Sequence, residues 1–144
     1  MSSAMKSIDS GKSCGEHRIL ICEDNHLIAR GCAMLLARAG YTVIGPAHSA
    51  EEALEMAYRH RPSLALLDIG LGGVLDGISV AAELAPLGVA VIFITADYRR
   101  AASEGREYAA EILIKPVRVG TVLASVASVL QNSQGTKSDG AAAV

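Results

Sequence analysis

The chain alternates short apolar runs with amphipathic segments from residue 17 onward. Five apolar runs predict strands, at residues 17–24, 41–45, 63–68, 88–95 and 111–115. A segment with helical character follows each run, and this order requires parallel strands joined by right-handed crossovers. Helices cover both faces of a parallel sheet. The pattern therefore predicts a doubly wound α/β domain with five parallel strands.

The predicted helices differ in strength. Gly40 follows the first helix as a plausible C-cap. Ser49 and Glu52 predict a capping box at the start of the second, in which each side chain accepts from the other's backbone N–H. Segment 97–109 is polar and interrupted by Gly105, so we expect a short or irregular fourth helix. Apolar stripes mark the first, third and last helices, at Ile28, Cys32, Leu35, Leu36 and Ala39, at Ile78, Ala81, Ala82 and Ala85, and at Val119, Val122, Leu123, Val126, Val129 and Leu130.

Composition narrows the class of protein. The 144 residues suffice for one domain, and 51% hydrophobic but 3% aromatic residues indicate an aliphatic core. A net charge of −2 with interspersed signs argues against nucleic acid and anionic membranes as partners. Cys14, Cys22 and Cys32 form no CxxC pair and are interpreted as reduced thiols. Without a bilayer-length apolar run or a signal peptide, we expect a soluble, cytoplasmic protein.

The two ends differ from the centre. Residues 1–16 and 132–144 are rich in Ser, Gly, Lys and Ala and show no sustained periodicity, which predicts a flexible arm and tail around a domain at 17–131. Residues 11–13, Gly-Lys-Ser, match the end of a P-loop. That motif needs a glycine where this chain has Lys6, so we favour the flexible arm.

Polar residues end the predicted strands. Glu23 and Asp24 end the first, Asp68 the third, Thr95 the fourth and Lys115 the fifth. Ligands of such sheets bind beyond the carboxyl ends of the strands, where these side chains converge. Three carboxylates repel one another unless a cation lies among them, and oxygen ligands suit Mg²⁺. A carboxylate there can attack a phosphoryl group, and Asp68, the central acid, is the candidate nucleophile.

These residues carry a resemblance over about residues 18–130. An acidic pair, a single aspartate, Asp-Gly at 76–77, Thr-Ala at 95–96 and Lys-Pro at 115–116 occur in order, and the chain is similar to the receiver domain of two-component response regulators. The resemblance implies a flavodoxin-like sheet with strand order 2-1-3-4-5. It also implies that Asp68 accepts a phosphoryl group from a sensor histidine kinase or a histidine phosphotransfer protein.

The resemblance further implies roles for the other residues at the strand ends. Asp24, Asp68 and the backbone carbonyl of Gly70 would bind Mg²⁺ (or Mn²⁺), with Glu23 nearby. Thr95 and Lys115 would bind the phosphoryl group. The segment after residue 130 is too short to fold alone, so we expect a single-domain regulator with no DNA-binding domain. It would catalyse its own phosphorylation and dephosphorylation, turn over no external substrate, and signal through a protein partner or a second copy of itself.

Several departures and alternatives stand beside this interpretation. Ile112 occupies the position where the family usually has a switch aromatic, and Tyr98 is either its substitute or an exposed loop residue. Asp97 lies at a position that tunes hydrolysis in receivers, without a predictable sign here. Glu23 and Asp24 could instead cap the following helix. Two functional alternatives are a binding module that is never phosphorylated and a phosphate shuttle or sink in a phosphorelay.

Overall fold

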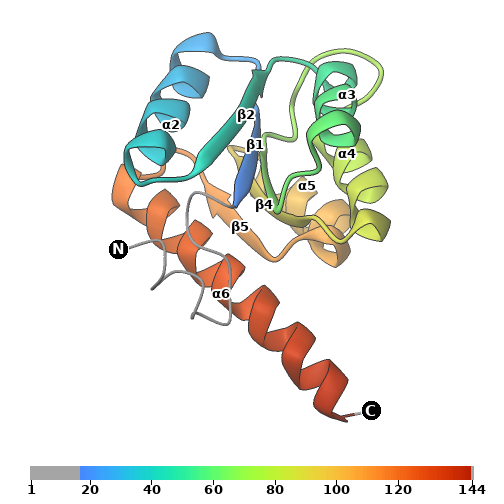
Figure 1. The fold of residues 1–144 in the computed structure, drawn as a ribbon. Coiled ribbons are helices and arrows are strands. Elements are labelled where there is room, and N and C mark those ends of the chain that lie inside the picture. The colour runs from blue at the N-terminus through green and yellow to red at the C-terminus, as the bar shows by residue number, and fades with distance from the viewer. Residues whose placement is uncertain (1–16, 144) are drawn as a thin grey trace.

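A computed structural model describes residues 17–143, with side chains described to residue 132. One parallel sheet has the strand order β2-β1-β3-β4-β5 (Figure 1). This order confirms the doubly wound fold predicted from the pattern and the order implied by the resemblance. The strands are β1 (Arg18–Cys22), β2 (Thr42–Ala47), β3 (Leu64–Leu67), β4 (Ala90–Thr95) and β5 (Glu111–Ile114).

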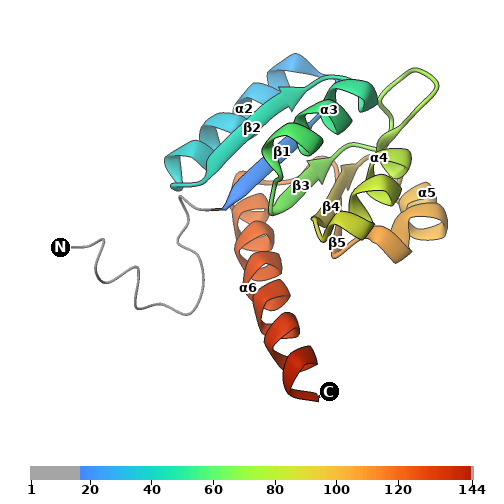
Figure 2. The ribbon, with the colours of Figure 1, turned by 45° about the vertical axis from the view of Figure 1, so that its right-hand side comes forward.

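Helices cover the two faces of the sheet. Helices α2 (His26–Arg38) and α6 (Val119–Ala143) lie on one face, and α3 (Ala50–His60), α4 (Gly77–Leu84) and α5 (Tyr98–Arg100) lie on the other (Figure 2). Side chains alternate between the faces within each strand. In β1, Ile19 and Ile21 join the core beneath α2 and α6, whereas Leu20 and Cys22 join the core beneath α3 and α4. Burial on both faces explains why the strand sequences are apolar throughout.

The helix caps agree with the sequence in position but differ in detail. Gly40 follows α2 with a φ of 102°, a left-handed conformation that favours glycine. Ser49 Oγ accepts from Glu52 N at 3.2 Å, as the capping box requires. The carboxylate of Glu52 accepts from His48 N at 2.8 Å, one residue before the predicted partner. The return bond of the box therefore forms with the residue that precedes the N-cap.

The buried face of α4 differs from the predicted stripe. The structure buries Gly77, Val80, Ala81 and Leu84, whereas Ala85 is exposed. A Cβ on Gly77 would lie 2.1 Å from the carbonyl oxygen of Asp68. This close approach of helix to strand fixes the rotation of α4 and places the face that begins at residue 77 against the sheet. The spacing of apolar residues alone does not predict this contact, so it does not predict which face of α4 is buried.

The predicted irregular fourth helix is confirmed. Helix α5 is followed by a π-helical turn at Ala101–Gly105 and a 3₁₀ turn at Arg106–Tyr108. Gly105 lies against the ring of Phe93, where a Cβ would be 2.7 Å from the nearest ring carbon. The absence of a side chain at Gly105 thus lets this segment pack closely on β4.

Most residues of the apolar stripe predicted for helix α6 are buried against the sheet. Val122, Val126, Val129 and Leu130 are buried, whereas Val119 is 58% exposed. The ribbon of α6 continues past residue 131 to Ala143 and extends away from the sheet (Figure 1). The boundary at 131 and the character of the tail remain predictions. Residues 1–16, with the Gly-Lys-Ser segment and Cys14, lie outside the described residues. Across residues 17–143, each helix is too short or too polar to cross a bilayer.

Candidate functional site

Hydrogen bonds just past the carboxyl ends of β1 and β3 hold the backbone of the site in place. Beyond the ends of these strands, Glu23 N donates to Ala47 O at 2.9 Å and Asp68 N donates to Cys22 O at 3.0 Å. The parallel ladder therefore continues one residue past each strand. It holds the two acidic residues side by side at the carboxyl edge of the sheet.

Three carboxylates meet at this edge. One oxygen each from Glu23, Asp24 and Asp68 lies within 4.8 Å of the others. Glu23 and Asp68 are buried, with 5% and 8% of their surface exposed, whereas Asp24 is exposed. The N-cap of α2 is Asn25, whose side chain accepts from Ile28 N at 3.0 Å. Neither acid is therefore the N-cap, although Glu23 Oε2 accepts from the N–H of Asn25 at 3.1 Å.

Lys115 joins the two buried carboxylates. Its Nζ donates to Glu23 Oε1 at 2.8 Å and to Asp68 Oδ2 at 2.9 Å. Burial raises the pKa of Glu23 above its ordinary value. Burial alone would lower the pKa of Lys115, but its hydrogen bonds to the two carboxylates outweigh that effect and raise it. The cluster thus has three carboxylates but one ammonium, which contacts two of them, and this excess of acidic groups favours a bound cation.

The donor set fits Mg²⁺. The cluster supplies carboxylate oxygens, and the exposure of Asp24 leaves one side open to water. Mg²⁺ prefers oxygen ligands and keeps several of its waters. Gly70 N donates to Asp68 Oδ1 at 3.2 Å, so the loop after β3 turns back over the carboxylate. The acidic cluster can therefore hold such an ion.

Thr95 lines the same pocket as Asp68 and Lys115. The residue is 2% exposed, and its Oγ1 accepts from Asp97 N at 3.0 Å. This bond leaves the hydroxyl proton of Thr95 free to donate to a ligand. Asp97 in turn accepts from Arg100 N at 3.1 Å and caps the short helix α5. The end of β4 and the first turn of α5 are therefore joined by consecutive hydrogen bonds.

These side chains surround a pocket of about 230 Å³. Of the residues predicted from sequence, Asp68, Gly70, Thr95 and Lys115 line it, and Glu23 and Asp24 join it through the carboxylate cluster. Arg100 also lines the pocket and was missed by the sequence analysis. It lies in a polar, irregular segment where no periodicity indicates which side chains face inward. The complete lining is Asp68, Ile69, Gly70, Thr95, Ala96, Asp97, Arg100 and Lys115.

Ile112, at the usual position of the switch aromatic, and Tyr98, its candidate substitute, lie in different surroundings. Ile112 is partly buried and packs against the core beneath α3 and α4. Tyr98 is 42% exposed, and its hydroxyl accepts from Arg106 Nη2 at 2.8 Å. Of the two interpretations of Tyr98, the exposed position agrees with a surface residue, which here begins helix α5 and does not lie in a loop.

Fold and site together define a class, a doubly wound domain with an acidic pocket at the carboxyl edge of its sheet. The sequence matches the response regulator receiver domain over residues 19–127. The chain belongs to this family, whose members act in two-component signalling.

Similar curated proteins are longer than this chain. The transcriptional regulatory protein PdtaR of Mycobacterium tuberculosis is 32% identical over 112 residues, which cover 76% of this chain and 54% of PdtaR. The phyllosphere-induced regulator PhyR of Methylorubrum extorquens is 35% identical over 121 residues, which cover 83% of this chain and 45% of PhyR. The chain spans about half the length of these relatives. The expected absence of a DNA-binding domain remains a prediction.

Solved structures share the fold. The signal receiver domain of a modulated diguanylate cyclase from Desulfovibrio desulfuricans is 35% identical, with a TM-score of 0.72 over 81% of this chain and 95% of that one. The response regulator protein TrrA from Thermotoga maritima is 25% identical, with a TM-score of 0.71 over 78% of this chain and 98% of the TrrA chain. The TrrA structure is a complex with Mg²⁺ and BeF.

Proposed function

We propose that this protein is a phosphoacceptor whose Asp68 receives a phosphoryl group from a sensor histidine kinase or a histidine phosphotransfer protein. The main support is the surroundings of the Asp68 carboxylate. Lys115 Nζ lies 2.9 Å from Oδ2, and carboxylate oxygens of Glu23 and Asp24 lie within 4.8 Å. Membership in the receiver family supports the same chemistry.

The transfer exchanges one bond to phosphorus for another. A carboxylate oxygen of Asp68 attacks the phosphorus, the bond from phosphorus to the donor's imidazole nitrogen breaks, and the electron pair returns to the ring. The ammonium of Lys115 then pairs with a phosphoryl oxygen, and the Thr95 hydroxyl donates a hydrogen bond to another. A bound Mg²⁺ or Mn²⁺, held by Asp24, Asp68 and the Gly70 carbonyl with Glu23 nearby, would offset charge on the phosphoryl oxygens.

The output of such a protein is an altered surface rather than a released product. Position 70, two residues after the acceptor, is glycine, so no acid stands there to protonate the leaving group of an external substrate. Phosphorylation adds about two negative charges to a pocket that the end of β4 and α5 help to form. A partner protein or a second copy of the chain would read the changed arrangement of these elements.

Intact mass spectrometry tests this proposal. The protein is incubated with Mg²⁺ and acetyl phosphate, alongside Asp68→Asn and a sample with the metal chelated. One phosphoryl adduct on the wild type alone is the expected result. If the wild type stays unmodified with acetyl phosphate and also with a phosphorylated histidine phosphotransfer protein, the phosphoacceptor role is wrong. The unphosphorylated binding module would then be the better description.

A further inference from the structure

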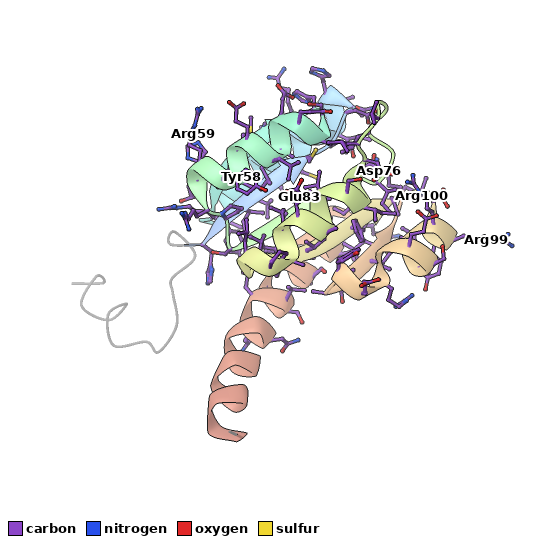
Figure 3. The ribbon with its side chains drawn as sticks, turned by 90° about the vertical axis from the view of Figure 1, so that its right-hand side faces the viewer. Tyr58, Arg59, Asp76, Glu83, Arg99 and Arg100 are labelled. Atoms are coloured by element: carbon purple, nitrogen blue, oxygen red, sulfur yellow. The ribbon has the colours of Figure 1, made fainter. Side chains whose placement is uncertain are left out.

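The pocket contains a second cation that the proposed transfer does not use. Arg100 lines the same pocket as Asp68 and Lys115. Its guanidinium makes an ion pair with Asp76 through Nη2 and Oδ2, and its Nε lies 3.3 Å from Glu104 Oε1. Figure 3 shows Asp76 and Arg100 next to each other at the N-terminal end of α4, with Arg99 pointing away from the body of the protein. Arg100 therefore has an anionic partner already, at the margin of the acceptor site.

Asp76 links this pair to the backbone of the acceptor. Its Oδ1 accepts from Ser79 N at 3.0 Å and from Ser79 Oγ at 3.2 Å, which caps α4. The next residue, Gly77, donates its N–H to Ile69 O at 3.0 Å and packs against the Asp68 carbonyl. Breaking the ion pair between Asp76 and Arg100 would therefore affect the first turn of α4, which is the turn that contacts the backbone of Asp68.

The ion pair is open to competition. The side chain of Arg100 is 36% exposed and that of Asp76 is 21% exposed, and partly solvated pairs contribute little net stability. A phosphoryl group on Asp68 would carry about two negative charges and several acceptor oxygens. Guanidinium binds such groups through two parallel hydrogen bonds. An anion of higher charge in the same pocket would therefore compete with Asp76 for Arg100.

We propose that Arg100 is an anion-binding residue of the pocket, which exchanges its partner Asp76 for the phosphoryl group on Asp68. The inference rests on the proposed function, because it needs a phosphoryl group on Asp68. The backbone N–H of Arg100 is held by Asp97, and the N–H of Asp97 is held by Thr95. Release of Asp76 would thus break the ion pair between α5 and the start of α4 and leave α5 attached to β4. The surface between α4 and α5 then reports the state of Asp68.

Beryllofluoride with Mg²⁺, a mimic of the phosphoryl group on a carboxylate, provides the probe. Its affinity for the full chain is measured by ¹⁹F NMR titration of the wild type, Arg100→Gln, Asp76→Asn and the control Arg99→Gln. Arg99 is exposed and adjacent, so the control makes the same change in net charge. Asparagine is as good an N-cap as aspartate, so Asp76→Asn keeps the cap of α4 while it weakens the ion pair.

The exchange predicts opposite effects for the two halves of the ion pair. We expect Arg100→Gln to weaken beryllofluoride binding roughly two- to fivefold, the range typical of a partly exposed ion pair. Asp76→Asn frees Arg100 and should tighten binding by a similar factor, while Arg99→Gln changes nothing.

Other outcomes would overturn the inference. If Arg100 only fastens α5 to α4, both variants shift the affinity in the same direction. No change in Arg100→Gln also contradicts the exchange. If the wild type itself fails to bind beryllofluoride and to accept phosphate, both the proposed function and this inference fail. A cooperative thermal transition in each variant shows that the fold is intact, with at most a small drop in melting temperature where the ion pair is lost.

Discussion

Glu23 is a buried carboxylate that shares one ammonium with a second buried carboxylate. Burial raises the pKa of Glu23, so its ionised form is costly at neutral pH in the absence of a metal. Glu23→Gln removes this charge, leaves Asp68 and Lys115 as a balanced pair and keeps one oxygen to accept from Lys115, but it loses the bond from Asn25 N to Glu23 Oε2, which is 3.1 Å long. We expect the gain to exceed that loss, so that this variant is more stable than the wild type by about 0.5 kcal/mol in urea unfolding without metal.

The same substitution should weaken the metal site. With one carboxylate fewer, Mg²⁺ should raise the stability of Glu23→Gln less than that of the wild type. Asp24→Asn serves as the comparison, because Asp24 is exposed and its charge is solvated without metal. A metal-free Glu23→Gln protein that is less stable than the wild type would show that hydrogen bonds to Glu23 outweigh the burial of its charge.

Gly77 is constrained by the backbone of Asp68. A Cβ at this position would lie 2.1 Å from the Asp68 carbonyl oxygen and 2.8 Å from the Asp68 carbonyl carbon. Because both are backbone atoms, no side-chain rotation can relieve the clash. We expect Gly77→Ala to lower the free energy of unfolding by about 2 kcal/mol or more, measured by urea denaturation. Gly73→Ala is an informative contrast, since its strain is backbone conformation in an open loop without a clash.

Some residues of the site could be predicted from the sequence and others could not. Asp68 and Lys115 could be predicted because each follows an apolar run, and parallel strands meet at their carboxyl ends. Arg100 and Asp76 lie 24 residues apart, and neither ends a strand. Their contact depends on the irregular turn of α5 and on the rotation of α4, which local pattern does not determine.

At the scale of elements, the ion pair of Asp76 and Arg100 joins α4 to α5. Burial alone would raise the pKa of Asp76, but hydrogen bonds from Ser79 and Arg100 outweigh it and lower the pKa below the ordinary 3.8. A group whose pKa falls on folding adds stability above its unfolded pKa, and that stability is lost as the pH drops through the folded pKa. The contribution is therefore fully present at neutral pH.

Asp76→Asn should accordingly be less stable than the wild type by about 0.5 kcal/mol near neutral pH, a small value because both side chains are partly solvated. The difference should shrink as the pH falls below 3.8 and vanish below the folded pKa. Urea midpoints over a pH series measure this. A difference that persists unchanged in acid would mean that the substitution perturbs the cap of α4 rather than the ion pair.

The elements themselves were largely predictable, and the exceptions have local causes. The strands and the start of α3 follow from apolar runs and from Ser49, because these signals lie within a few residues of the structure that they specify. The buried face of α4 was misplaced because tertiary contact at Gly77, rather than apolar spacing, fixes its rotation. Hydrophobic periodicity thus predicted where elements lie better than how they are turned.

At the scale of the whole molecule, a metal ion bound by the acidic cluster would couple metal binding to folding. Ligand that binds only the folded state stabilises it, and a concentration of about ten times the dissociation constant contributes about 1.4 kcal/mol. For a domain of this size we expect Mg²⁺ at that concentration to raise the melting temperature by about 3 to 6 °C. Chelation should reverse the shift, and Asp68→Asn should reduce it. A sodium salt of equal ionic strength controls for screening of the three carboxylates. If the sodium salt produces the same shift as Mg²⁺, the cluster holds no specific ion and acts only as a region of screened negative charge.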